Sequence, residues 1–251
     1  MPPVSLLFHD VFVRDPRESG FASPAADRYK LSVRAFDAQL AGLSYIQKKG
    51  SDPFFRLTFD DGGESFYTIV AEKLEARGMR ACCFVTTECI GRRGFLTAAQ
   101  IRELDRRGHT IGTHSVSHPS PFSALTCSEM RREWTDSLTA LEDIVGHAVT
   151  TGSLPGGSFS HEVALSAAES GLLLLFNSEP VRSVHRLENC TIAGRFTIRA
   201  GAHAGLSRSL AHPASWTRTR QWASWNAKRL VKPLLGSSYP RVADWIHGGV
   251  R

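Results

Sequence analysis

Two neighbouring aspartates are the residues of this chain with the clearest potential for chemistry. Asp60 and Asp61 follow an apolar run at residues 54–59 and precede Gly62 and Gly63. A hydrophobic run that stops at acidic residues and glycines is typical of a buried strand that delivers carboxylates to a loop. Adjacent carboxylates repel each other unless a positive group separates their roles, and a metal ion is one such group. An acidic turn without any ligand is the alternative interpretation.

A second candidate is the pair of histidines at the ends of the segment HSVSH, His114 and His118. Two imidazoles at this spacing can reach one ion if the chain turns, and Pro119 excludes a long regular helix there. Together with one aspartate they would form a three-ligand site that leaves positions for water and substrate, as catalytic zinc sites do. A histidine pair alone is a weak signal, and the Asp-Asp-Gly upstream strengthens it.

Strands and helices alternate along the chain. Apolar runs predict strands at residues 4–8, 54–60, 80–86, 109–113, 148–154, 172–176 and 195–200. Periodicity and capping residues predict helices at 33–49, 65–77, 97–107, 160–170 and 216–235, and one that Thr126 or Ser128 caps and that runs to about 145. Residues 14–30 and 201–215 are predicted to be loops. This alternation favours a parallel sheet with crossover helices, open or closed into a barrel.

The polar residues converge on one rim of this predicted sheet. The first strand ends at His9, the second at the two aspartates and a later one just before the two histidines, while residues 153–157 follow another. Parallel α/β folds bind their ligands at the carboxyl ends of the strands. We therefore expect these groups to share one site.

Length and composition fit one domain. The chain has 251 residues, 42% of them hydrophobic and 22% charged, and a barrel-like α/β fold of this length is ordinary. The net charge of +6 is spread along the chain, and we expect no nucleic-acid partner. A stripe of tryptophans near the C-terminus could bind sugar or nucleic acid, although packing on the domain is the favoured interpretation: Trp216, Trp222, Trp225 and Trp245.

The sequence predicts a cytoplasmic protein with reduced thiols. Its five cysteines are odd in number and lack zinc-ribbon spacing. The N-terminal segment has no basic region and only a short apolar stretch, which does not match a secretion signal. No apolar run approaches the length of a membrane span.

Two motifs resemble a known family. LTFDDGG at residues 57–63 and HSVSH at 114–118 are similar to the first two motifs of the polysaccharide deacetylases, the NodB-homology or carbohydrate esterase family four enzymes. The resemblance covers roughly residues 4–200. It implies a deformed (β/α) barrel over residues 1–200, with residues 201–251 as a C-terminal loop and helical extension packed on the barrel.

The resemblance also implies roles for the site residues. Asp60 would be the general base, and Asp61, His114 and His118 would hold a divalent metal, which we expect to be zinc. The implied reaction removes N-acetyl groups from a sugar polymer or glycan precursor. Side chains alternate along an extended chain, so Asp61 could bind the metal while Asp60 stays free to accept a proton from an acidified water. The alternatives are a metal-dependent esterase or amide hydrolase acting on another small group, and a catalytically silent sugar-binding relative.

The general acid that protonates the leaving nitrogen departs from the usual pattern. The family carries this histidine in a late Leu-x-His motif, but residues 195–200 contain no histidine. LLFHD at residues 6–10 resembles that motif displaced to the front, as in circularly permuted members such as the poly-N-acetylglucosamine deacetylases. His9 is therefore the candidate acid, and a purely structural hydrogen bond is the alternative.

The third family motif, Arg-x-Pro-aromatic-Gly, aligns with residues 153–157 but departs from it. Ser153 replaces the arginine that orients the base, and Gly156 replaces the aromatic residue. We therefore expect Asp60 to lose its usual ion-pair partner and to be less firmly oriented. Three arginines could supply the charge from elsewhere, and the sequence does not distinguish them: Arg56, Arg182 and Arg195.

Four further residues complete the predicted site. The backbone N–H of Gly156, next to Pro155, could help to hold the oxyanion. Asn177 and Glu179 follow the strand at 172–176 and could line a sugar subsite. A turn at the exit of that strand explains their polarity nearly as well.

Overall fold

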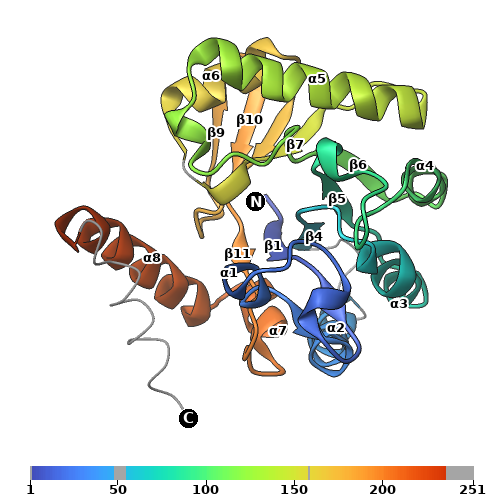
Figure 1. The fold of residues 1–251 in the computed structure, drawn as a ribbon. Helices are drawn as coiled ribbons and strands as arrows, with labels where there is room; N and C mark the ends of the chain where they lie inside the picture. Colours follow the sequence, from blue (N-terminus) through green and yellow to red (C-terminus); the bar gives the residue numbers. More distant parts are fainter. Residues whose placement is uncertain (1, 48–54, 158, 236–251) are drawn as a thin grey trace.

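A curled nine-stranded sheet forms the centre of the protein, and the helices surround it (Figure 1). The computed structural model describes residues 2–47, 55–157 and 159–235. Its sheet has the order β11-β1-β4-β5-β6-β7-β8-β10-β9, and neighbouring strands are parallel except for β10 and β9. This arrangement confirms the predicted deformed (β/α) barrel.

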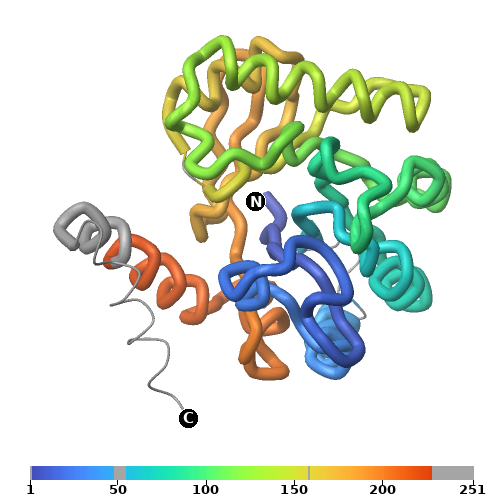
Figure 2. Tube along the Cα trace, viewed as in Figure 1, coloured from blue at the N-terminus to red at the C-terminus, as the bar shows by residue number. Residues whose placement is uncertain are grey.

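The strands of this sheet are short and mostly buried. They are β1 (Val4–Phe8), β4 (Phe55–Phe59), β5 (Cys82–Val85), β6 (Thr110–Thr113), β7 (Thr151–Ser153), β8 (Leu174–Phe176), β9 (Val184–Leu187), β10 (Cys190–Ala193) and β11 (Phe196–Thr197). A separate two-stranded sheet pairs β2 (Val11–Phe12) with β3 (Leu31–Ser32). Figure 2 follows the chain from blue to red and shows the segment that contains β11 returning to β1.

The helices lie on the outer side of the sheet. They are α1 (Pro24–Asp27), α2 (Val33–Gln47), α3 (Ala71–Glu75), α4 (Ala98–Arg106), α5 (Cys127–Val145), α6 (His161–Glu169), α7 (Leu206–Ala211) and α8 (Trp216–Leu235), and a π-helical turn at Phe66–Val70 precedes α3. Capping boxes start α4 at Thr97 and α5 at Thr126, where each threonine hydroxyl accepts a backbone N–H of the first turn. None of the described helices combines the length and apolar character that crossing a membrane requires.

The register of the parallel strands brings several strand ends to the same level. Phe8 at the end of β1 pairs with Phe59 at the end of β4, and Val85 at the end of β5 pairs with Thr113 at the end of β6. Backbone hydrogen bonds continue this register into the loops. The Asp60 N–H donates to the carbonyl of Phe8 at 3.1 Å, and the His114 N–H donates to the carbonyl of Val85 at 2.9 Å. The loops that carry the candidate residues therefore leave one rim of the sheet.

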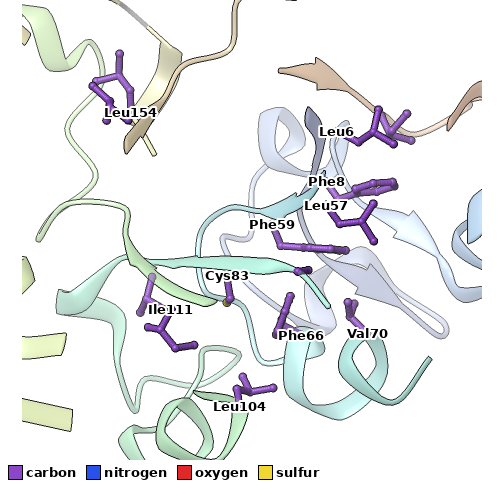
Figure 3. Close-up of a cluster of buried hydrophobic side chains, with 14 of the residues drawn as sticks. Leu6, Phe8, Leu57, Phe59, Phe66, Val70, Cys83, Leu104, Ile111 and Leu154 are labelled. Carbon is purple, nitrogen blue, oxygen red and sulfur yellow. The ribbon is translucent and has the colours of Figure 1, made fainter. Parts of the chain in front are cut away.

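An aromatic cluster supports this rim from inside the core. The rings of Phe8 and Phe59 stack with centroids 5.2 Å apart, and Phe36 from α2 meets both edge-on. Phe66 adds another edge contact to Phe59 (Figure 3). Fully buried aromatic rings contribute large apolar areas and favour such edge geometries, so the ends of β1 and β4 are firmly held.

Several predicted elements differ from the structure. The hairpin of β9 and β10 was not predicted because its two-residue turn, Glu188-Asn189, lacks the Asn-Gly or Gly-containing signal of tight hairpins, although Glu188 does adopt φ 51°. The strand predicted at residues 195–200 is shortened to β11. The single helix predicted at 65–77 begins with the π-helical turn and its α-helix ends at Glu75.

The predicted loops also contain structure. Residues 14–30 include the short helix α1, and residues 201–215 include α7, which packs on α2 through bonds between Ser207 and Gln39. Trp216 on α8 is 83% exposed, so the packing favoured for this tryptophan is wrong. Phe54, Trp245 and the predicted helix end at Lys49 lie outside the described residues.

Replacing Phe36 with alanine tests the aromatic cluster. We expect Phe36→Ala to lower the free energy of unfolding by about 3–5 kcal/mol, because it leaves a cavity between two fixed strands. Urea unfolding followed by fluorescence measures the change. Val13 is 64% exposed, and Val13→Ala serves as the control that should change stability by less than about 0.5 kcal/mol. Equal effects of the two variants would contradict this packing.

Candidate functional site

Three of the predicted residues meet at the rim. The Nε2 atom of His114 lies 3.5 Å from Asp61 Oδ1, and the Nε2 atom of His118 lies 3.6 Å from the same oxygen. One ligand atom from each residue lies within 4.8 Å of the others. Asp60 is adjacent, with its Oδ2 3.9 Å from His114 Nε2. The structure therefore brings together the aspartates and histidines that the sequence selected.

The separations of these atoms suit a small metal ion. Distances of 3.5 and 3.6 Å exceed those of a normal hydrogen bond. Two ligands at tetrahedral angles around zinc, each roughly 2.0 to 2.1 Å from the ion, lie about 3.3 Å apart. Two imidazole nitrogens and one carboxylate oxygen form a donor set that zinc accepts while keeping positions open. Asp61, His114 and His118 therefore fit a divalent metal.

The hydrogen bond of His114 favours the tautomer that a metal needs. Its Nδ1 lies 2.8 Å from the carbonyl oxygen of Ser153, an acceptor, so Nδ1 carries the proton and donates. The lone pair is then left on Nε2, which faces Asp61. Metal-binding histidines are commonly fixed in this way by a carbonyl or carboxylate on the other ring nitrogen.

Backbone strain is concentrated in the two loops of the site. Four non-glycine residues in the described ranges have positive φ, and three of them belong to these loops: Asp61 at 76°, Ser115 at 65° and His118 at 57°. Such conformations cost energy and are found where the surroundings impose them, often at functional sites. Asp61 is therefore not on an extended chain. The predicted separation of the aspartates by side-chain alternation is wrong, because the turn brings both carboxylates to His114.

Glu133 on α5 holds the loop that carries His118. Its carboxylate accepts the backbone N–H groups of Val116 and Ser117 at 2.9 Å each, and it also accepts the Ser117 hydroxyl at 2.7 Å. The His118 N–H in turn donates to the Ser115 hydroxyl at 3.1 Å. The loop thus takes the tight turn that Pro119 predicted, with a carboxylate from a neighbouring helix at its centre.

Asp60 is held by an arginine that follows β10. Arg195 Nη1 donates to Asp60 Oδ1 at 2.7 Å, and Nη2 donates to Oδ2 at 2.9 Å. The Ser153 hydroxyl donates to the same Oδ2 at 3.0 Å. The expectation that Asp60 loses its ion-pair partner is therefore wrong, because the segment between β10 and β11 supplies a guanidinium. Of the three arginines that could do so, the structure selects Arg195.

The charges of the site fix its protonation states. Burial acts to raise the pKa of Asp60, but the charges of Arg195 and His114 outweigh it and hold this pKa well below its ordinary value. Burial also acts to raise the pKa of Asp61, but the nearby His114 and the charges of His9 and His118 outweigh it and give a net lowering. Burial and the charge of His114 lower the pKa of His118 to about 4. At neutral pH the aspartates are ionised and His118 is neutral, as metal ligands must be.

The pKa of His114 moves the other way. Burial acts to lower it, but the negative charges of Asp60 and Asp61 outweigh burial and raise the pKa. Two buried carboxylates therefore attract positive charge to this point of the rim. A divalent cation at this point would likewise compensate the negative charges of Asp60 and Asp61.

Asp10 holds the loop that carries the two aspartates through hydrogen bonds to serines. The sequence analysis did not select this residue. Its Oδ1 accepts the hydroxyls of Ser19 at 2.6 Å and Ser65 at 2.7 Å, and the Ser65 N–H donates back to Ser19 at 2.8 Å. A Cβ on Gly63 would lie 1.9 Å from Asp10 Oδ1. The second glycine of the DDGG segment thus allows the loop to approach Asp10. The signal in the sequence was an acid two residues after the end of a strand.

Lys30 fixes the segment that borders His118. Its buried ammonium group donates to the carbonyl oxygens of Pro16, Ser19 and Phe21 at 2.6, 2.7 and 2.7 Å. The ring of Phe21 lies against the imidazole of His118, with centroids 5.1 Å apart. A stretch predicted as plain loop therefore forms one wall of the site.

His9 directly follows β1, and Asp60 directly follows the neighbouring strand β4. The ring of His9 lies 4.8 Å from the ring of Tyr29, and within the described part of the chain its Nδ1 has no hydrogen-bond partner. A positive charge on His9 would lower the pKa of Asp60 and of Asp61. The alternative interpretation was a structural hydrogen bond, and among the described residues Nδ1 makes none.

The four remaining predicted residues lie in turns after β7 and β8. Pro155 is buried, and Gly156 has φ 64°, where a Cβ would lie 2.5 Å from the Ser120 hydroxyl. Asn177 Oδ1 accepts the Glu179 N–H at 2.9 Å, which is the strand-exit turn considered as the alternative. The roles of these residues toward substrate stay predictions.

Comparison with known proteins extends these observations. A family model described as polysaccharide deacetylase matches residues 47–175, more than half of the chain. The putative polysaccharide deacetylase YxkH of Bacillus subtilis is 29% identical over 133 residues, covering 53% of this chain and 47% of that protein. A chitin deacetylase of Pestalotiopsis sp is 31% identical over 96 residues, covering 38% and 32%. The chain thus spans less than half the length of either relative.

A solved structure has the same fold. The Streptococcus pyogenes deacetylase PplD in complex with acetate superposes with a TM-score of 0.67 at 19% identity, covering 85% of this chain and 99% of that one. Similarity at this level of identity establishes the fold alone. His9 and Arg195 both lie outside the residues that the family model matches.

Zinc binding tests the three-residue cluster. We expect the metal-free protein to bind one zinc ion, seen by calorimetry and as an increase in Tm, because ligand binding to the folded state stabilises it. Asp61→Ala and His118→Ala should each abolish the shift. His147 is exposed and remote from the cluster in its ion pair with Asp105, so His147→Ala should bind zinc normally. A shift that survives both ligand variants would place the ion elsewhere.

Replacing Glu133 tests the support of the loop. Glu133→Ala should weaken zinc binding about 10- to 100-fold without removing a ligand, because the His118 loop loses the carboxylate that orders it. Competition with a chelating dye measures the affinity. Asp136→Ala, an exposed acid on the same helix, is the matched control for lost negative charge. Equal affinities in the two variants would contradict the role of Glu133.

Proposed function

This chain belongs to the polysaccharide deacetylase family, and on that premise we propose that it is a metal-dependent hydrolase that removes N-acetyl groups from a sugar polymer or glycan precursor. The observation that carries the proposal is the asymmetric pair of aspartates. Asp61 faces two histidines at metal-ligand separations, while Asp60 beside it is bound by Arg195. One carboxylate is thereby available to a cation and the other to a proton.

In this proposal Asp61, His114 and His118 hold a divalent metal, with zinc as our choice. When bound, the metal supplies Lewis-acid polarisation of the acetyl carbonyl and acidifies a water molecule. The chain contributes the donors, the buried setting of Asp61 and His114, and the tautomer of His114 that the Ser153 carbonyl selects. The strained turns hold these donors before any ligand arrives, which limits reorganisation on binding.

Asp60 is the proposed general base. Its carboxylate is 5% exposed and ionised, and its Oδ2 lies 3.9 Å from His114 Nε2, so it borders the place where the attacking water would be held. Because the pKa of Asp60 is low, it is a weak base, and proton transfer to it depends on an acidified water. Its fixed direction therefore matters more than its basicity.

His9 is the proposed general acid. An amine is a poor leaving group unless its nitrogen is protonated as the carbon–nitrogen bond breaks. His9 directly follows β1, whose end pairs with the end of β4, so His9 lies at the same rim as Asp60. We propose the N–H of Gly156, beside Pro155, as the donor to the oxyanion, and Asn177 and Glu179 as residues bordering the sugar.

An acetylated carbohydrate is the proposed substrate. Among the relatives one is described as a chitin deacetylase, which supports an N-acetylated glycan. The silent sugar-binding alternative was motivated by Ser153 in place of arginine. Since Arg195 occupies the charge position beside Asp60, that motivation is removed.

Acetate release from N-acetylglucosamine oligomers tests the proposal. We expect zinc-dependent release that Asp60→Asn lowers by about 10²- to 10⁴-fold, because the asparagine cannot accept the proton. Asp143 is an exposed acid, and Asp143→Asn should leave kcat unchanged. Release from O-acetylated sugars without release from N-acetylated ones would favour an esterase. A protein that binds no zinc and releases no acetate from either substrate would overturn the proposal.

Replacing His9 separates its role from that of Asp60. His9→Ala should lower kcat about 100-fold on the N-acetylated oligomer but by less than about threefold on p-nitrophenyl acetate, because nitrophenolate leaves without a proton. Asp60→Asn should lower both activities. Equal losses on amide and ester in His9→Ala, or unchanged amide turnover, would show that His9 is not the acid.

A further inference from the structure

We propose that Arg195 is the positioning residue of Asp60, and that Arg195 and Ser153 act as one unit in which the charge comes from the segment between β10 and β11. This inference rests on the proposed function, since it concerns the direction of the proposed base. It assigns a task to a residue outside the stretch that the family model matches. Three observations carry it: the form of the ion pair, the immobility of the guanidinium and the complementarity of Ser153.

The ion pair has the geometry that fixes a carboxylate in direction. Nη1 and Nη2 of Arg195 donate to the two oxygens of Asp60 at 2.7 and 2.9 Å, so both carboxylate oxygens are bound by one guanidinium. A bidentate pair restricts rotation, whereas a single contact leaves the carboxylate free to turn. Asp60 therefore has a defined direction, even though its neighbour Asp61 adopts a strained turn.

The guanidinium of Arg195 is buried and fully hydrogen-bonded. Arg195 is 0% exposed, and its five N–H groups match five hydrogen bonds. Besides the two to Asp60, these go to the carbonyl of Asn177 at 3.0 Å and to the hydroxyls of Thr58 at 3.3 Å and Ser153 at 2.8 Å. The guanidinium carbon also lies near two aromatic rings, 5.9 Å from the centroid of Phe84 and 5.7 Å from that of Phe176.

Contacts of the neighbouring backbone position Arg195 beside Asp60. The Arg195 N–H donates to the carbonyl of Glu179 at 2.8 Å, and a Cβ on Gly194 would lie 2.3 Å from that same oxygen. The glycine thus permits a close approach between the end of β10 and the turn after β8. Asn177 and Glu179, which the sequence suggested for a sugar subsite, both contact Arg195 through their backbone carbonyls.

Ser153 completes the unit because it is small and polar. Its hydroxyl accepts from Arg195 Nη2 at 2.8 Å and donates to Asp60 Oδ2 at 3.0 Å, so it bridges the two charged groups. A larger side chain at this fully buried position would compete with the guanidinium for the same volume. Serine at 153 and arginine at 195 are therefore complementary, and the segment between β10 and β11 compensates for the departure from the third family motif.

The experiment compares Arg195→Gln, Arg195→Lys and Ser153→Ala for kcat, KM and zinc affinity, with Tm to confirm folding at the assay temperature. We expect Arg195→Gln to lower kcat about 100-fold, as a misdirected catalytic group does, while KM for the N-acetylglucosamine oligomer and zinc affinity change less than about threefold. Arg195→Lys keeps the charge without the bidentate contact and should recover about a tenth of wild-type kcat. Ser153→Ala should lose less than about tenfold.

A merely structural role would give a different pattern. In that case the loss of activity in each variant would follow the fraction of folded protein, and zinc affinity would fall in parallel. Asp60→Asn/Arg195→Gln removes both charges and should regain the Tm lost in Arg195→Gln without regaining activity. If Arg195→Gln does not fold, Arg195→Lys carries the comparison. A folded variant of either kind with kcat within threefold of wild type would overturn the inference.

A second readout keeps the inference separate from the proposed function. In a crystal structure of Arg195→Gln, or of Arg195→Lys if the first does not fold, we expect the Asp60 carboxylate to turn away from its wild-type direction. An unchanged direction would overturn the inference. If wild-type protein releases no acetate from any acetylated sugar, the proposed function fails, and the orientation of Asp60 in the variant crystal still decides whether Arg195 positions it.

Discussion

Two buried carboxylates that are adjacent in the chain impose the constraint on which the rest of this site depends. Asp60 and Asp61 are 5% and 6% exposed, and two such charges repel strongly when water is excluded. The structure gives each carboxylate a separate partner. Arg195 binds one carboxylate in a bidentate pair, and the other faces two histidines at separations that suit a metal ion. The proposed division of roles between the aspartates rests on this division of partners.

The parallel sheet makes that division possible by bringing distant segments to one rim. Level strand ends place the loops after β1, β4, β6 and β7 together, and β11 pairs with β1 at the edge of the sheet. Each loop is then fixed by a partner from another element. Asp10 holds the aspartate loop, Glu133 holds the histidine loop, and the turn after β8 holds Arg195. The strained backbone at Asp61 and His118 persists because these contacts surround it.

Local patterns in the sequence were sufficient for the parallel α/β sheet and for the cluster of candidate metal ligands, whereas the deformed barrel was implied by the family resemblance. Apolar runs and caps mark strands and helices, and Asp61, His114 and His118 follow strand ends that parallel pairing must bring together. The partner of Asp60 could not be assigned in this way. Arg195 reaches Asp60 through an approach that depends on Gly194, β10 and the turn after β8, and the hairpin of β9 and β10 lacked its usual turn signal. The strained turn at Asp61 was missed for a similar reason, since it arises from tertiary contacts.

The most direct test of the account is anomalous diffraction at the zinc absorption edge from crystals grown with zinc. The account predicts one peak roughly 2.0 to 2.2 Å from an Asp61 oxygen and from the Nε2 atoms of His114 and His118. It also predicts that Asp60 keeps both contacts to Arg195 and does not bind the ion. A zinc ion bound by Asp60, or an Asp60 released from Arg195 in the metal-bound protein, would contradict the separate roles of the two aspartates.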